Sequence, residues 1–272
     1  MLSRIWKSAF HTLLIISLSA LSVGAANQVP IDDKTLNDPA YKAMNNAQNQ
    51  NRFLMVYIYE STLESPVYDS YNTLKDQRPE QVNSITISTQ KPGESWLVNT
   101  YNLKYAPLPM VMVLAPNGAI AGTFSKPMTS DQLIASISIS PVIQQCLLAF
   151  QKRSLVLLCI QGDATQDNEA AMEGVTQFSQ DPIYAKNTKI VTLDPANPEE
   201  TGLLNQLGLT EKPKTAMTYF FAPPGKLIGK WKGPTSKESL VKQLTNALAQ
   251  SRSCRDPNCA DPSCPPPSQA KQ

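Results

Sequence analysis

The sequence has almost no histidine. Of its 272 residues only one is histidine, His11, and it lies in an N-terminal stretch with the character of a removable export signal. Ser-His-Asp and Cys-His catalysis, His-Glu zinc peptidase sites and mixed Cys/His metal sites all need this side chain. The processed chain should therefore contain none of these sites, and we expect no catalytic residue, no metal site and no cofactor.

An excess of charge of one sign is also lacking. The chain has 24 Lys and Arg against 22 Asp and Glu. Arg4 and Lys7 supply the difference, and residues 1–26 contain no acid, so 24 − 2 leaves 22 basic against 22 acidic side chains in the rest. A neutral body has no electrostatic footprint for nucleic acid, which we therefore exclude as a partner. With 42% hydrophobic residues the chain can still bury a core.

The first 26 residues have the order of a secretory signal peptide. A basic start, residues 1–7, is followed by a mostly apolar run over 9–23 and by the small residues Val23-Gly24-Ala25-Ala26. This order predicts export and cleavage after Ala25 or Ala26; an uncleaved membrane anchor is the alternative. No later run is long and apolar enough to span a bilayer, so we expect a periplasmic or secreted protein with no stable membrane span after cleavage.

An internal repeat organises the rest of the chain. Shifting the sequence by 107 residues places Pro109–Ile137 on Ala216–Leu244 without a gap. The identical pairs are Met110/Met217, Ala115/Ala222, Pro116/Pro223, Gly118/Gly225, Gly122/Gly229, Pro127/Pro234 and Leu133/Leu240. Many of them fall at turn positions, which indicates that one structural unit occurs twice.

Each copy predicts a strand, a tight turn, a second strand and a helix. The β-branched and aromatic runs 111–114 and 218–221 predict the first strands, and the Pro-Asn-Gly and Pro-Pro-Gly tripeptides after them predict hairpin turns. Thr129 with Gln132, and Thr235 with Glu238, predict capping boxes that open the helices. We expect the second of these helices to end near Ala249.

The preceding halves also correspond. Strands are predicted at 53–59, 82–88, 155–160 and 189–193, and helices at 39–48, 68–76, 95–101, 141–150, 168–179 and 199–207. Strands that alternate with helices favour a βαβ unit and a parallel strand pair. The sequence thus predicts an α/β protein in which each unit has a mixed central sheet flanked by helices.

The segment YNLKYAPLPMVMVLAPNGAIAGTF resembles the second half of the thioredoxin-like domains of secreted bacterial proteins. The resemblance implies tandem thioredoxin-like domains at 27–139 and 140–250. It places Pro109 at the cis-proline of that fold, whereas the second copy has Ala216 there.

A thioredoxin oxidoreductase carries a Cys-x-x-Cys pair after its first strand, at a helix N-terminus that lowers the pKa of the attacking thiol. The two windows where the resemblance places this pair, residues 60–67 and 161–167, contain no cysteine. We therefore expect a module that recognises a protein partner or extended peptide, not an enzyme. The resemblance implies that Leu108, Pro109 and Met110 line the binding edge, and both domains could engage one partner.

The cysteines lie elsewhere. Cys146 falls in an apolar helix and Cys159 in an apolar strand, and both are expected to be buried. Whether they form a disulfide with each other is left open by the sequence. Residues 251–272 predict a disordered tail that is rich in Pro and Cys. Its Cys254, Cys259 and Cys264 allow three roles: disulfides, including a disulfide-linked oligomer or a thiol-disulfide relay; soft-metal handling; or no defined thiol role.

Overall fold

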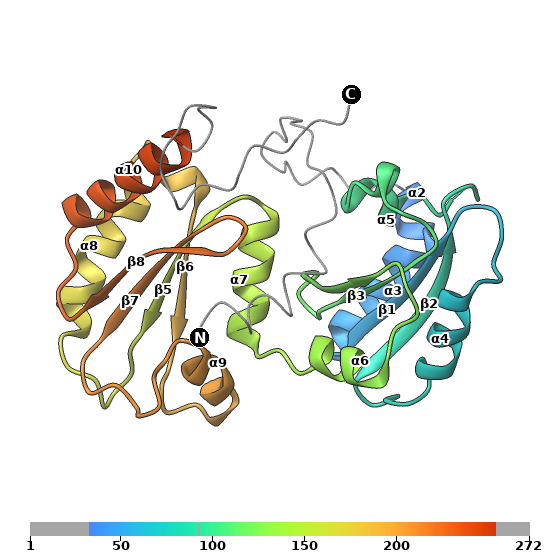
Figure 1. The fold of residues 1–272 in the computed structure, drawn as a ribbon, viewed down its shortest axis with the longest axis horizontal. Helices are drawn as coiled ribbons and strands as arrows, with labels where there is room; N and C mark the ends of the chain where they lie inside the picture. The colour runs from blue at the N-terminus through green and yellow to red at the C-terminus, as the bar shows by residue number, and fades with distance from the viewer. Residues whose placement is uncertain (1–32, 92, 254–272) are drawn as a thin grey trace. The chain divides into compact units, whose positions relative to one another are not determined.

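The computed structural model describes residues 33–91 and 93–253 (Figure 1). The expectations for the signal segment, residues 1–26, and for Cys254, Cys259 and Cys264 lie outside the described residues. Contacts divide the chain into two compact units. Unit 1 is residues 1–148 with 206–208, and unit 2 is residues 149–205 and 209–272.

Unit 1 contains a four-stranded sheet in the order β2-β1-β3-β4. Its elements are α2 (Asp33–Asn37), α3 (Pro39–Asn49), β1 (Phe53–Tyr59), α4 (Pro66–Leu74), β2 (Val82–Ser88), α5 (Trp96–Thr100), a 3-10 turn (Leu103–Tyr105), β3 (Met110–Leu114), β4 (Ile120–Phe124) and α6 (Ser130–Ile137). Strand β1 runs parallel to β2 and antiparallel to β3, and β3 is antiparallel to β4. The helix α7 (Pro141–Gln151) contains the boundary between the units.

Unit 2 repeats this plan in the order β6-β5-β7-β8. Its elements are β5 (Leu155–Ile160), α8 (Asn168–Gln180), β6 (Thr188–Leu193), α9 (Thr201–Gln206), β7 (Met217–Ala222), β8 (Lys226–Lys232) and α10 (Lys237–Ser253). Again the first pair is parallel and the other two are antiparallel. This order and direction are those of a thioredoxin-like domain, so the predicted tandem fold is confirmed.

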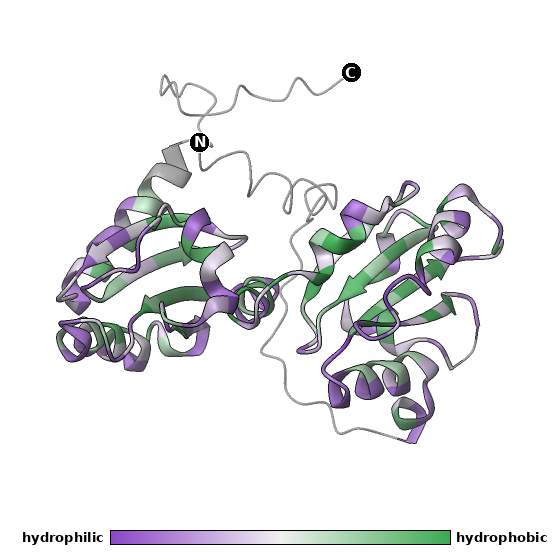
Figure 2. Ribbon diagram, turned by 90° about the horizontal axis from the view of Figure 1, so that it is seen from below, coloured by the Kyte–Doolittle hydropathy of each residue, from purple (hydrophilic) through white to green (hydrophobic). Residues whose placement is uncertain are grey.

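The core of unit 1 lies on both faces of its sheet. One face packs against α4 and α6 through Tyr71 and Leu133, and the other packs against α3 and α5 through Met44 and Leu97. The central strands β1 and β3 are therefore buried on both sides, which explains their unbroken apolar sequences (Figure 2). In unit 2, α8 and α10 cover one face of the sheet in the same way.

Two details of the second repeat differ from expectation. The capping box at Thr129 is present, with Gln132 reaching back to the Thr129 amide, but Thr235 does not cap α10. Thr235 is buried and hydrogen-bonds the Gly233 carbonyl, and Ser236 accepts the amide of Ser239 in its place. Helix α10 also continues to Ser253 instead of ending near 249.

Two peptide bonds in the described residues are cis. Leu108–Pro109 is the one predicted from the sequence, and Pro223–Pro224 lies in the hairpin turn of unit 2. Among the described helices, none is by itself long and apolar enough to cross a bilayer; only α6 and α7 taken together, bent by 91° at their junction, reach that length and composition.

Candidate functional site

A buried tyrosine holds the window after β1, residues 60–67, which contains no cysteine. Ser65 caps α4 by accepting the Tyr68 amide. The hydroxyl of Tyr57, which is fully buried, donates to the Leu63 carbonyl at 2.8 Å and lies 3.0 Å from the Ser65 hydroxyl. Burial raises the pKa of Tyr57, so its hydroxyl keeps the proton that it donates. This part of the chain is thus fixed in position without any group that could act as a nucleophilic thiolate.

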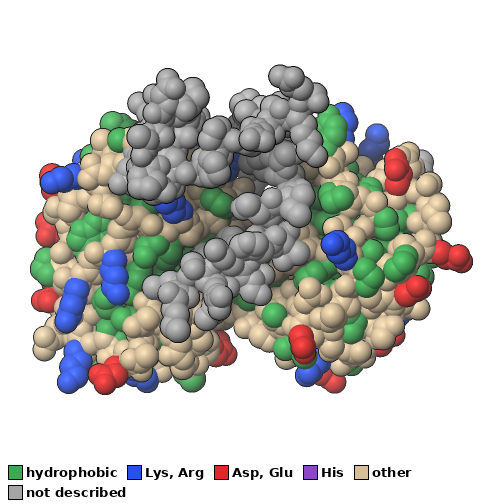
Figure 3. Space-filling view, viewed as in Figure 1, with side chains coloured by type: hydrophobic (Ala, Val, Ile, Leu, Met, Phe, Trp, Pro, Cys, Tyr) green, Lys and Arg blue, Asp and Glu red, His purple; other side chains and the backbone are tan. Residues whose placement is uncertain are grey.

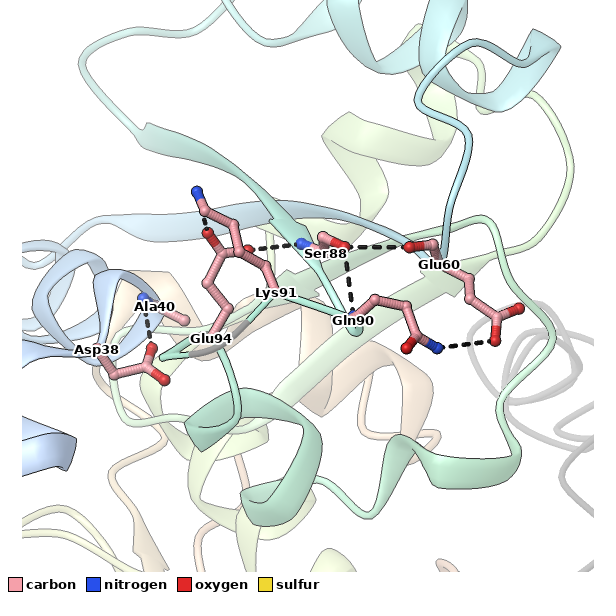
Figure 4. A network of polar contacts seen from close by, with 7 residues as sticks. All are labelled: Asp38, Ala40, Glu60, Ser88, Gln90, Lys91 and Glu94. Atoms are coloured by element: carbon pink, nitrogen blue, oxygen red, sulfur yellow. Dashed lines mark hydrogen bonds and ion pairs between the residues drawn. The ribbon is translucent and has the colours of Figure 1, made fainter.

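A second polar network holds the start of the same window (Figure 4). The Ser88 hydroxyl donates to the backbone carbonyl of Glu60 at 3.1 Å. The side-chain amide of Gln90 donates to the Glu60 carboxylate at 3.1 Å. The backbone N–H of Ser88 donates to Glu94 at 2.7 Å, and Lys91 pairs with Glu94 at 2.8 Å. Sequence reasoning missed this network because it joins the last residue of β2 to loop residues that have no hydrophobic periodicity.

The strand register places the cis-proline segment beside this window. Ile58 pairs with Met110, so Leu108 and Pro109 continue the antiparallel line opposite Glu60 and Tyr59. Leu108 and Pro109 are half-buried. Met110 is only 3% exposed and packs in the core, so it can take part through its backbone but not through its side chain.

The backbone of Leu108 is unpaired. Within residues 33–91 and 93–253, no hydrogen bond engages its N–H or its carbonyl oxygen. A half-buried backbone amide without a partner is the type of group that an added strand can satisfy.

The corresponding segment of unit 2 is bridged to its own window by backbone hydrogen bonds. The Gln166 amide donates to the Lys214 carbonyl at 2.9 Å, and the Ala216 amide donates to the Gln166 carbonyl at 2.9 Å, which forms a parallel bridge to Thr215. Ala216 corresponds to Pro109, which has no N–H to donate. Unit 1 therefore cannot form the second bond of this bridge. The residue that corresponds to Leu108 is Thr215, and within the described residues its own N–H and carbonyl are also unpaired, because the bridge uses the Lys214 carbonyl and the Ala216 amide on either side of it. The two repeats thus differ in the groups that flank this position.

Replacing Ala216 by proline should loosen this bridge. The Gln166 carbonyl would lose its donor, and a hydrogen bond contributes about 1 kcal/mol net, so the Gln166 amide should exchange with solvent deuterium severalfold faster. Hydrogen exchange resolved at Gln166 measures the effect. Lys214→Ala, which keeps both backbone groups, is the control and should leave the rate unchanged. Equal rates in all three proteins would show that the bridge does not restrain the window.

The two described cysteines are buried, as predicted. Cys146 is 8% and Cys159 is 2% exposed, and neither is half of a disulfide. Burial raises the pKa of Cys159 to about 12. A thiol with this pKa is almost entirely protonated near neutrality, and only the thiolate attacks a disulfide. In the described residues, no group of three or more His, Cys, Asp or Glu side chains could hold a metal ion.

Thiol labelling tests this assignment. In a variant with Cys254, Cys259 and Cys264 all changed to serine, we expect almost no reaction with a disulfide reagent at pH 8 while the chain is folded. At that pH a thiol of pKa about 12 has roughly one thiolate in ten thousand. Both remaining thiols, Cys146 and Cys159, should react after denaturation, and Cys159→Ala should halve that yield. Rapid labelling of the folded chain would contradict the assignment.

Comparison with known proteins gives no family model and no curated protein that matches the chain. Solved structures of thioredoxin-domain proteins do match. A disulphide isomerase from Xylella fastidiosa Temecula1 shares 12% identity over 41% of this chain and 88% of its own, with a TM-score of 0.27. The first two thioredoxin domains of Saccharomyces cerevisiae Eps1p share 11% over 73% and 94%, with a TM-score of 0.26. Zinc-bound human ERp44 shares 8% over 75% and 54%, with a TM-score of 0.29.

These similarities are low. The assignment of a thioredoxin-like fold therefore rests on the strand order and the strand directions in this chain.

Proposed function

We propose that the protein is a non-catalytic thioredoxin-like module that binds an extended segment of a partner protein at the edge beside Leu108 and Pro109. The observation that carries the proposal is the unpaired backbone of Leu108 in the described residues, next to a window fixed by Tyr57 and Glu60. An extended segment laid along this edge would pair with both backbone groups of Leu108.

The surroundings favour an apolar or aromatic side chain in the partner. The Leu108 side chain is half-buried against the core, and Tyr105, on the 3-10 turn just before it, is 74% exposed. The ammonium of Lys104 lies 5.5 Å from the centre of the Tyr105 ring, so the ring is held beside a positive charge. The partner segment would insert an apolar residue next to Leu108 and stack another on Tyr105.

We place this site in unit 1, which has the proline at this position. In unit 2 the equivalent residue is Ala216, and the Lys214 carbonyl and the Ala216 amide are already bonded to Gln166, so fewer backbone groups remain there for a partner strand. Neither window supplies a thiol, which supports binding without disulfide exchange. We further propose that the partner is met in the periplasm or outside the cell, as the N-terminal signal predicts.

Site-specific photo-cross-linking in the native host tests the function. A benzophenone side chain at Pro107, which is exposed and adjacent to Leu108, should form one discrete adduct with another protein, and reductant should not release it. The matched control is the same side chain at the exposed Asn72 on α4, which should give no such adduct. The proposal is wrong if Pro107 gives none, or if both positions give the same products. An adduct that vanishes when Cys254, Cys259 and Cys264 become serine would instead favour the thiol relay.

A further inference from the structure

The edge strand β8 of unit 2 carries lysines without acidic partners. Lys226, Lys230 and Lys232 are exposed, and none of them forms an ion pair with any residue in the described part of the chain. Figure 3 shows several Lys or Arg side chains on the face of unit 2 that carries β7 and β8 in Figure 1. The matching strand of unit 1, β4, reads IAGTF and has no charge.

The surrounding sequence is strongly basic. Residues 212–242 contain seven lysines and a single acid, Glu238. One of the lysines, Lys237, is neutralised by Asp181 at 2.6 Å. Although the chain as a whole is nearly neutral, the fold thus gathers uncompensated positive charge along one strand, and an uncompensated group of charges attracts a partner of the opposite sign.

The same strand has open backbone groups. The Gly233 amide donates to the Ala216 carbonyl, and in an antiparallel ladder the hydrogen-bonded pairs alternate with pairs whose backbone groups point outward. With Tyr219 opposite Lys230 and Met217 opposite Lys232, the amides and carbonyls of Lys230 and Lys232 point away from β7. No described residue hydrogen-bonds to them.

These lysines have two consequences for what can pair with β8. Lysines on an edge strand are a common protection against association with another sheet edge. A second copy of β8, or any basic strand, would place like charges opposite each other, which is destabilising. An acidic strand would instead be attracted to β8, since each of its carboxylates would lie beside an uncompensated ammonium group.

We propose that the β8 edge is a second docking surface, which takes an extended acidic segment of a partner protein by strand addition. The segment pairs with the backbone of Lys230 and Lys232 and places its carboxylates beside their ammonium groups. Lys230 is held over the Tyr219 ring, 4.9 Å from its centre. Leu227, at the N-terminal end of β8, is 45% exposed and offers an apolar contact. The side-chain amide of Gln243 already donates a hydrogen bond to the Ile228 carbonyl. That carbonyl is not open to a partner, so the added segment is short.

Fluorescence anisotropy with a defined probe tests this surface. The probe is a labelled octapeptide of alternating glutamate and valine, added to the full chain. We expect binding that weakens as salt is raised. Lys230→Glu with Lys232→Glu should weaken binding about tenfold or more. The matched control, Lys186→Glu with Lys189→Glu, makes the same change of charge at exposed positions elsewhere in unit 2 and should change affinity by less than about twofold.

Two further probes separate strand addition from other attraction. An octapeptide N-methylated at alternate residues keeps its charges but loses amide donors, and it should bind far more weakly. Vesicles containing phosphatidylglycerol should not compete for the site. The proposal is overturned if both charge reversals act alike, if N-methylation has no effect, or if vesicles bind the chain through Lys230 and Lys232 better than the peptide does. Circular dichroism of each variant confirms that a loss of binding is not a loss of fold.

Discussion

Replacing Gly174 by alanine should destabilise unit 2 by about 3 kcal/mol, the upper range for adding a methyl group to a closely packed core. Gly174 lies in the middle of α8, where the segment that leads into α10 crosses it. A Cβ atom here would stand 2.6 Å from the Cα of Ser236 and closer still to the Thr235 carbonyl oxygen. Both are backbone atoms, and Thr235 is itself held because its amide donates to the Ala170 carbonyl, so the neighbours cannot move without separating the two helices.

Chemical denaturation followed by tryptophan fluorescence measures the effect, because Trp231 packs against the core of unit 2. The control is Gly202→Ala in α9, where no atom lies within 4 Å of the added methyl group. This substitution should be neutral or should stabilise the unit by up to about 1 kcal/mol, the helix-propensity gain of alanine over glycine. Equal effects of the two substitutions would mean that α8 and the start of α10 are not in contact at this point.

Replacing Asp38 by alanine should destabilise unit 1 by about 3 kcal/mol. Asp38 is 2% exposed and caps α3 by accepting the amides of Ala40 at 2.8 Å and Tyr41 at 3.4 Å. Its second oxygen accepts the Trp96 amide at 2.8 Å, and this bond ties α3 to α5. Loss of a helix cap costs about 1 kcal/mol, and loss of a charged partner for a further amide costs roughly 1.5–3 kcal/mol more.

Asparagine at the same position separates the two contributions. Asp38→Asn keeps one oxygen for the cap of α3 but turns an amide donor toward the Trp96 amide, so we expect about half the loss seen with alanine. The midpoint of chemical denaturation for unit 1 reports both variants. If asparagine were as stable as aspartate, the bond to Trp96 would contribute nothing, and the predicted value for alanine would be too large.

Local sequence patterns were sufficient for the architecture. The 107-residue repeat, the apolar strands and the Pro-x-Gly turns predicted two mixed sheets, and both formed with the expected parallel strand pair. These features depend on residues within one element or one turn, where side-chain periodicity and backbone preference act directly. The last helix was placed four residues short because its end has no glycine or proline that would stop it.

The sequence alone determined that no thiol occupies either window and that Pro109 lacks the amide that Ala216 keeps. Only the tertiary structure decided how these two differences shape the sheet edges. The bridge from Gln166 to Thr215 and the unpartnered lysines of β8 depend on segments that are distant in sequence, and a one-dimensional pattern does not report which backbone groups remain unpaired after such segments meet. Pairing across a sheet edge is a long-range property, so the unpaired backbone of Leu108 in unit 1, the backbone bridge in unit 2 and the basic strand became evident only in the folded chain.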